Sequence, residues 1–140
     1  MASIFSRIID GELPGRFVWR DDRAVAFMSI APLQPGHTLV VPVDEVDHWI
    51  DLDPDLAAHL MVVSQTIAQA IHRAFSPVKV GLMLAGLEVP HTHVHVVPMR
   101  GVHDLDFSNA DQHASGDDIE AAAERIRAEL RAAGAPGVSA

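Results

Sequence analysis

Three histidines at alternate positions, His91, His93 and His95, are the residues of this chain whose type and spacing point most directly to chemistry. In a β-strand, side chains two residues apart share one face, so the three imidazoles would stand in a row. A neutral imidazole is a nucleophile at neutral pH, and neighbouring rings of like charge lower each other's pKa. Such a row suits attack on phosphorus, in which the central ring forms a covalent nucleotidyl intermediate and its neighbours hydrogen-bond the phosphate oxygens.

Two other interpretations of the row stay open at this point. Histidines two residues apart on a strand can bind zinc, because neutral imidazole is a common zinc ligand. A row of histidines can also be an ordinary solvated face of a strand. A fourth histidine, His37, opens another apolar strand after a Pro-Gly turn, and both strands end in Val-Val-Pro. We therefore expect the two strands to be neighbours in one sheet.

The remaining sequence predicts the elements that must position these histidines. A short helix is expected over 3–9, because Ser3 can cap it and Asp10-Gly11 ends it. Apolar residues at helical spacing after Asp53-Pro54 predict one long helix that ends before Ser76-Pro77. A second amphipathic helix is predicted from about residue 115 to Gly134. Strands are predicted at 16–20, 24–29, 37–41, 78–84 and 92–97. The order of these elements favours an α+β domain with an antiparallel sheet of about five strands.

Length, composition and charge limit what the chain can be. Its 140 residues are typical of one domain, which we place at residues 1–133, with residues 134–140 as a flexible tail. The absence of cysteine excludes a disulfide framework and a thiol nucleophile. A net charge of -9 disfavours nucleic acid and anionic membranes as partners, whereas a small phosphate compound can still bind locally. With no apolar run long enough to cross a membrane, we expect a cytoplasmic protein.

The segment His91-Thr-His-Val-His-Val-Val97 resembles the signature of the histidine triad (HIT) family, which is His-x-His-x-His followed by two apolar residues. The resemblance also covers residues 4–14, 26–32 and 36–42 and the pair Ala85-Gly86, so it extends over residues 4 to about 100. The family comprises nucleotide hydrolases and transferases. The resemblance implies a homodimer and a hydrolase that cleaves a P–N or P–O bond at the α-phosphate of a purine nucleotide derivative.

The resemblance also implies a role for each matched residue. His93 would be the nucleophile, His95 would hydrogen-bond the phosphate, His91 would orient the site and His37 would support the row. Four apolar residues, Phe5, Ile8, Phe27 and Ile30, would enclose the base. No cofactor is implied.

Several positions differ from the family pattern. Because of these differences, two alternative functions stay open. Ser29 stands where the family often has the aspartate that binds ribose, and Leu87 and Glu88 replace polar residues ahead of the triad. Ser3 and Ser6 stand where some members have two zinc-binding cysteines, so we expect no structural zinc. The alternatives are a nucleotide-binding or interaction module with little catalysis, and a metal-dependent hydrolase that uses the histidines as ligands.

Overall fold

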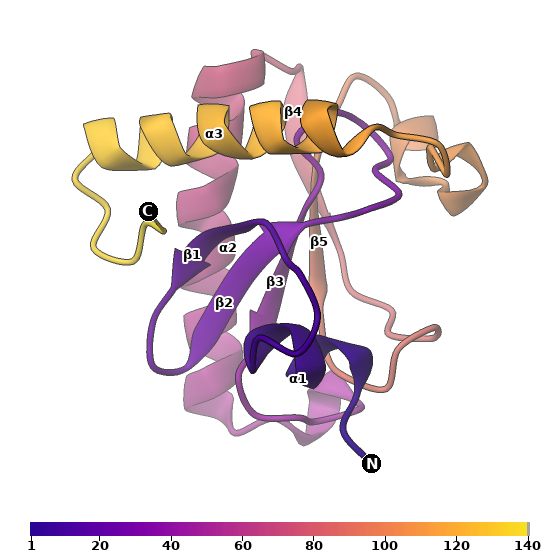
Figure 1. Ribbon diagram of the computed structural model, residues 1–140, viewed down its shortest axis with the longest axis vertical. Helices are drawn as coiled ribbons and strands as arrows, with labels where there is room; N and C mark the ends of the chain where they lie inside the picture. The colour runs from indigo at the N-terminus through magenta and orange to yellow at the C-terminus, as the bar shows by residue number, and fades with distance from the viewer. Residues whose placement is uncertain (140) are drawn as a thin grey trace.

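A single five-stranded antiparallel sheet organises the computed structural model, which describes residues 1–139 (Figure 1). The strands lie in the order β1-β2-β3-β5-β4, and each pairs antiparallel with its neighbour. Their bounds are β1 Phe17–Arg20, β2 Ala24–Met28, β3 Thr38–Pro42, β4 Lys79–Met83 and β5 Val94–Met99. The α+β class predicted from the sequence, with about five strands, one long helix and a C-terminal helix, is confirmed.

Two helices cover one face of the sheet and form the main core with it. Helix α2, Pro54–Phe75, begins where Asp53 accepts a hydrogen bond from the Asp55 amide, and it ends at Ser76 in a left-handed conformation. Helix α3, Gly116–Ala132, begins at Ser115, whose hydroxyl accepts from the Asp118 amide, and it crosses α2 (Figure 1). Apolar residues of both helices pack on the same side of β1, β2, β3 and β5. No helix of the described chain is long and apolar enough to cross a membrane.

The other face of the sheet is covered by a short helix and by two single-turn segments. Helix α1, Ile4–Ile9, lies in front of the sheet in Figure 1, and its Phe5 packs on the second core cluster with Val25, Phe27 and Leu39. After β5 the chain makes two 3-10 turns, Val102–Leu105 and Phe107–Asn109. Because both coverings lie on the face opposite α2, the central strands β2, β3 and β5 are buried on both faces, whereas the edge strand β4 is partly exposed.

The strand that carries the triad begins later than the sequence suggests. We predicted a strand from Thr92, whereas β5 begins at Val94. The reason is that the backbone N–H and the hydroxyl of Thr92 both donate to the carbonyl of Val46, which lies in the loop after β3. Thr92 is therefore bonded to a loop. His91 and His93 consequently lie just ahead of β5 rather than within it.

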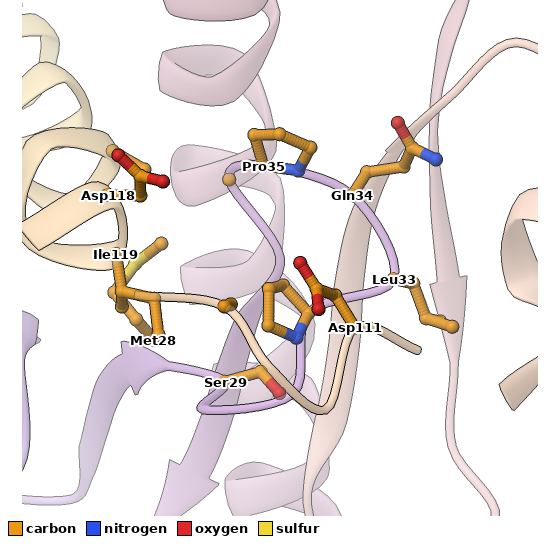
Figure 2. Close-up of a pocket in the computed structure, with 12 residues that line it drawn as sticks. Met28, Ser29, Leu33, Gln34, Pro35, Asp111, Asp118 and Ile119 are labelled. Carbon is orange, nitrogen blue, oxygen red and sulfur yellow. The ribbon is translucent and has the colours of Figure 1, made fainter. Parts of the chain in front are cut away.

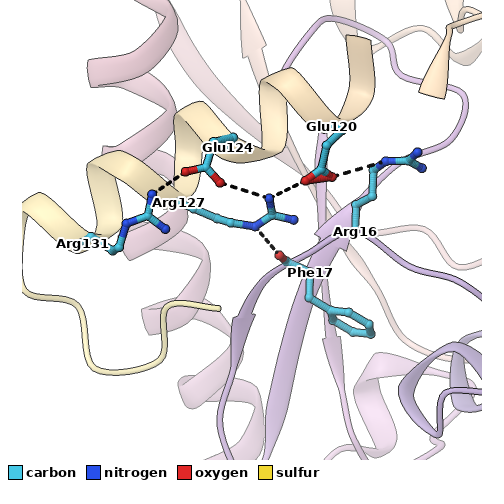
Figure 3. A network of polar contacts seen from close by, with 6 residues as sticks. All are labelled: Arg16, Phe17, Glu120, Glu124, Arg127 and Arg131. Atoms are coloured by element: carbon cyan, nitrogen blue, oxygen red, sulfur yellow. Dashed lines mark hydrogen bonds and ion pairs between the residues drawn. The ribbon is translucent and has the colours of Figure 1, made fainter. Parts of the chain in front are cut away.

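A buried arginine ties α3 to the first strand (Figure 3). Arg127 donates from Nε to the carbonyl of Phe17 at 2.8 Å and from Nη1 to Glu120 at 2.7 Å. Glu124 contacts both Arg127 and Arg131, while Arg16 approaches Glu120. Because the guanidinium has a backbone partner and two carboxylate partners, its charge is satisfied where it is buried.

The segment that the sequence predicts as a flexible tail contacts β1. The amide of Arg20 donates to the carbonyl of Gly137, and the amide of Ser139 donates to the carbonyl of Val18. Val138 forms a bridge with Trp19, and a side chain at position 137 would overlap the Trp19 indole. These residues therefore extend the edge of the sheet beside β1 and cover Trp19.

Deletion of residues 135–140 should lower the free energy of unfolding by about 1–3 kcal/mol, because it removes three backbone hydrogen bonds, those of Gly137, Ser139 and Ala135, and exposes part of the Trp19 indole. Urea unfolding followed by tryptophan fluorescence measures the change. Equal stability of the shortened and full-length chains would contradict the packing described for this segment.

Candidate active site

The fold brings all four predicted histidines together on the face of the sheet beneath α1. Antiparallel pairing of β3 with β5 places Leu39 opposite His95, so His37 lies beside His95 with ring centroids 5.1 Å apart. The rings of His93 and His95 are 4.9 Å apart. Phe5 contacts both His91 and His93, which shows that the row lies on one face as the spacing predicts.

The row is buried rather than exposed. The exposed fractions are 0% for His91, 2% for His93 and 6% for His95, although an exposed strand histidine would be expected from alternation alone. Burial results from long-range packing, since the ring of Phe5 lies 4.9 Å from His93 and that of Phe107 lies 4.9 Å from His95. Substitution of His93 by alanine would therefore leave a cavity, and a side chain of similar length is the better test of its role.

The backbone fixes the protonation of the central ring. Nδ1 of His93 lies 2.7 Å from the carbonyl oxygen of His91. A carbonyl oxygen can only accept a hydrogen bond, so the proton of neutral His93 is on Nδ1. Nε2 of that ring then carries a free lone pair, which is the form required of a nucleophile.

A chain of directed hydrogen bonds fixes the opposite protonation on His95. The amide of Leu33 donates to Nδ1 of His37 at 2.9 Å, so the proton of neutral His37 is on Nε2. That nitrogen lies 2.9 Å from Nδ1 of His95, which must accept. Neutral His95 therefore carries its proton on Nε2, where it can donate to a phosphate oxygen.

Burial keeps these supporting rings neutral. It lowers the pKa of His37 to about 4, with a further contribution from the neighbouring His93. It lowers the pKa of His95 to about 3, again with contributions from nearby histidines. The pKa of His91 is also lowered by burial, against the opposing effects of the Pro42 carbonyl and Glu45. At neutral pH the hydrogen bonds described above consequently join neutral rings.

The reactive nitrogens of the row reach solvent. Among residues 1–139, Ser64 Oγ is the one side-chain polar atom that is fully buried and has no hydrogen-bond partner. Nε2 of His93 and Nε2 of His95 also have no hydrogen-bond partner in the protein, but neither atom is fully buried. The two buried rings thus present a lone pair and an N–H donor, neither of which has a partner in the protein and neither of which is fully closed off from solvent.

The first ring of the row is held at both nitrogens. Nε2 of His91 lies 2.8 Å from the carbonyl of Pro42 and must donate to it. Nδ1 of His91 therefore accepts from the hydroxyl of Ser3 at 2.7 Å. Since both nitrogens are occupied, His91 has a supporting place in the row and no free atom for a ligand.

The four apolar residues predicted to enclose a base do not lie in equal environments. Phe5 and Phe27 are buried and pack edge to face with each other. Ile8 is half-buried beside them, and Ile30, in the loop after β2, is 80% exposed. Of the four, Ile8 and Ile30 thus keep free apolar surface, and Ile8 packs against the cluster that contains the two phenylalanines.

The two polar residues predicted to contact a nucleotide lie on loops. Glu88 is exposed in the segment between β4 and β5. Ser29 accepts from the Ala31 amide and lies at the edge of a pocket of about 260 Å³ (Figure 2). That pocket opens between the loop after β2 and the start of α3, and none of the four histidines lines it. Ser29 and Leu33 therefore both line this pocket from the loop after β2.

Four partners of the histidines were not singled out by the sequence patterns. They are the amide of Leu33, the hydroxyl of Ser3 as a partner of His91, the carboxylate of Glu45 and the ring of Phe107. A pattern of side chains in the sequence does not show which backbone amide donates a hydrogen bond to a histidine. Glu45 is distant from the row in sequence, so only the folded chain reveals its place.

The neutral buried rings predict how stability depends on pH. Between pH 6.5 and about pH 4 the unfolded chain binds protons that His37 and His95 do not bind when folded. The free energy of unfolding should therefore fall as the pH drops below 6.5, by up to about 1.4 kcal/mol per pH unit for each ring. Urea unfolding at several pH values measures this dependence, which should be shallower in His95→Asn. Imidazole NMR should show both rings still neutral at pH 5.5, and protonation of either ring above pH 6 would contradict the assignment.

Comparison with known proteins places this geometry in a family. A model of the HIT domain matches residues 10–102. An uncharacterized HIT-like protein of Borreliella burgdorferi is 37% identical over 102 residues, which are 68% of this chain and 73% of that protein. A zinc-bound histidine triad family protein from Mycobacterium smegmatis superposes with a TM-score of 0.82 at 26% identity, over 96% of both chains. A hypothetical histidine triad nucleotide-binding protein from Sulfolobus tokodaii gives a TM-score of 0.78 at 28% identity, over 91% of both chains.

Ser3 and Ser6 do not suit a structural zinc at the positions where some members of the family have two zinc-binding cysteines. Ser3 and Ser6 offer neutral hydroxyls in place of thiolates, which are the ligands that structural zinc prefers. The Ser3 hydroxyl already donates to Nδ1 of His91, and Nε2 of that ring donates to the Pro42 carbonyl, so His91 has no nitrogen free for a metal. Within residues 1–139 no group of three or more histidine, aspartate or glutamate side chains is placed to share a metal ion.

The family match includes the residues that form the row. Residues 10–102 contain His37, His91, His93 and His95, and they make up most of the chain. The relative from B. burgdorferi and the solved structures agree with the match in sequence and in fold. This protein belongs to the HIT family.

Proposed function

We propose that the protein is a nucleotide hydrolase that cleaves a P–N or P–O bond at the α-phosphate of a purine nucleotide derivative through a covalent adduct on His93. The observation that carries the proposal is the unprotonated Nε2 of His93, which has no partner in the protein and is not fully closed off from solvent, next to the ring of His95 with its protonated Nε2. The relative from S. tokodaii, whose name describes it as nucleotide-binding, supports a nucleotide as the ligand.

The proposed reaction has two displacements at phosphorus. Nε2 of His93 attacks the α-phosphorus, an N–P bond forms, and the bond to the leaving group breaks. The leaving amine or oxygen takes that electron pair, with a proton from solvent. The His93 ring now carries a positive charge, and its Nδ1–H donates more strongly to the His91 carbonyl. Water then attacks phosphorus and releases a proton to solvent, the N–P bond breaks, and His93 regains its lone pair.

The neighbouring histidines stabilise this reaction without changing their protonation. Nε2–H of His95 donates to a phosphate oxygen as negative charge shifts onto it. His37 keeps that proton in place because its own Nε2–H occupies Nδ1 of His95. Ile8 and Ile30 offer the exposed apolar surface for the base, while Ser29 and Glu88 are candidates for contacts with the remaining polar groups.

His93→Gln should lower turnover of adenosine 5′-phosphoramidate by about 1,000-fold or more, because the amide cannot act as the nucleophile. Glutamine is chosen since it fills more of the buried site than alanine. His103→Gln, at an exposed histidine after β5, is the matched control and should turn over like the wild type. Intact-mass analysis after a brief quench without acid should find a nucleotidyl increment on the wild type, located to His93. Binding of adenosine monophosphate without any turnover by the wild type would instead identify a nucleotide-binding module.

A homodimer is also part of the proposal, and one side of the molecule supports it. β4 is an edge strand of the sheet, so one row of its backbone groups lacks a strand partner. Beside it, α2 exposes Met61 and Val62, and β4 exposes Leu82. Two shallow hollows of about 270 and 310 Å³ share Met61 and Leu82 in their walls. A second copy could pair its own β4 here and bury these apolar side chains.

The double substitution Met61→Lys and Leu82→Lys should convert the protein from a dimer to a monomer, because it would place charges in the proposed apolar interface. Light scattering coupled to size-exclusion chromatography measures the mass in solution. Val102→Lys, at an exposed valine that belongs to neither α2 nor β4, is the control and should remain dimeric. A wild type that is monomeric at micromolar concentration would refute the proposed interface.

A further inference from the structure

Helix α1 is too short to hold its place unaided. It has six residues, and an isolated helix of that length is unstable in water. It nevertheless lies across the row of histidines and places Phe5 against His93. Contacts from elsewhere in the chain must therefore fasten it.

Glu45 supplies the first of these contacts. It lies in the loop after β3, and its Oε1 accepts from the backbone N–H of Ser3 at 2.6 Å and from the hydroxyl of Ser6 at 2.8 Å. No ion pair involves this carboxylate among residues 1–139, so N–H and O–H donors of the α1 segment satisfy it. These donors also lower the pKa of Glu45, the Ser3 amide most of all, which keeps the carboxylate ionised.

Ser3 joins the same helix to the row of histidines. Its hydroxyl oxygen accepts from the Ser6 amide at 3.0 Å and so caps α1. Its hydroxyl proton points to Nδ1 of His91 at 2.7 Å, because Nε2 of His91 is committed to the Pro42 carbonyl. Ser3 is buried, which protects this bond from water. One serine thus connects the helix cap, the Glu45 loop and the first ring of the row.

Helix α1, held in this way, in turn restrains His93, the proposed nucleophile. The Phe5 ring stands edge to face against His93, with an interplanar angle of 79° and a centroid distance of 4.9 Å. His91, held by Ser3, supplies the carbonyl that fixes the proton of His93. The plane of the His93 ring and its hydrogen bond therefore both depend on segments that Ser3 and Glu45 hold.

We propose that Glu45 and Ser3 form a clasp that fastens α1 over the row of histidines and positions His93 for attack, an inference that rests on the proposed function for its catalytic part. Both are positioning residues, because neither approaches the free Nε2 of His93. A small displacement of a reacting group from its productive position reduces turnover strongly. The clasp therefore acts on turnover through His93, and it also acts on binding of the base because α1 carries Ile8.

Glu45→Ala tests the clasp with two independent readouts. Hydrogen exchange at the amides of Arg7 and Asp10, which bond to the carbonyls of Ser3 and Ser6, should accelerate by about tenfold or more as α1 opens. Exchange in α2 should stay as in the wild type. The kcat for adenosine 5′-phosphoramidate should fall by about tenfold or more because His93 is displaced, and KM should rise because α1 carries Ile8 of the proposed base-binding surface. Glu45→Gln, which keeps an acceptor oxygen without the charge, should lie between the two proteins in both readouts.

Asp44→Ala is the matched control. Asp44 is an exposed carboxylate next to Glu45 and makes no hydrogen bond within the described chain, so its removal should change neither readout. Wild-type exchange of α1 in Glu45→Ala would overturn the clasp, and faster exchange with unchanged kcat would overturn its positioning role. A wild type without turnover would refute the proposed function alone, since exchange in α1 still decides whether Glu45 holds the helix.

Discussion

The hydrogen bond from Nδ1 of His93 to the carbonyl oxygen of His91 is the constraint on which the rest of the site depends. An imidazole has two nitrogens, and only the unprotonated one can attack. Because the acceptor is a backbone carbonyl two residues earlier, the choice of nitrogen is made by the local chain path. The sheet and its two coverings then keep that path fixed and leave the other nitrogen open.

The supporting histidines extend the same principle across two strands. The backbone amide of Leu33 donates to His37, and this sets the direction of the hydrogen bond from His37 to His95. As a result, the proton of His95 lies on Nε2. Burial contributes by keeping these rings neutral, since a protonated His37 could not accept from Leu33. Packing and protonation are therefore coupled, and the cover that α1 and Phe107 provide is part of the chemistry.

The sequence predicted the regular part of this arrangement well. Asp53-Pro54 and Ser76-Pro77 mark α2 because capping and proline geometry are local properties. Alternation correctly placed Val94 and Val96 against the helices and the histidines on the opposite face. The repeated Val-Val-Pro runs correctly suggested that the strands carrying His37 and His95 are neighbours. Each of these signals is carried by residues close together in the chain.

What the sequence could not predict depends on contacts between distant segments. Burial of the row requires α1 and the turn that carries Phe107, and no periodic pattern encodes their position. Glu45 reaches Ser3 across 42 residues, and Thr92 pairs with a loop carbonyl that delays the start of β5. The contact of residues 137–139 with β1 was missed for a related reason, because glycine and alanine near a chain end suggest mobility unless the partner strand is known.

Nitrogen-15 NMR of the histidine side chains at neutral pH tests the central claim most directly, because it identifies which ring nitrogen of His93 carries the proton without requiring a substrate. The account predicts a proton on Nδ1 and an unprotonated Nε2, with the reverse arrangement on His95. A proton on Nε2 of His93, or rapid exchange of the proton between its two nitrogens, would contradict it.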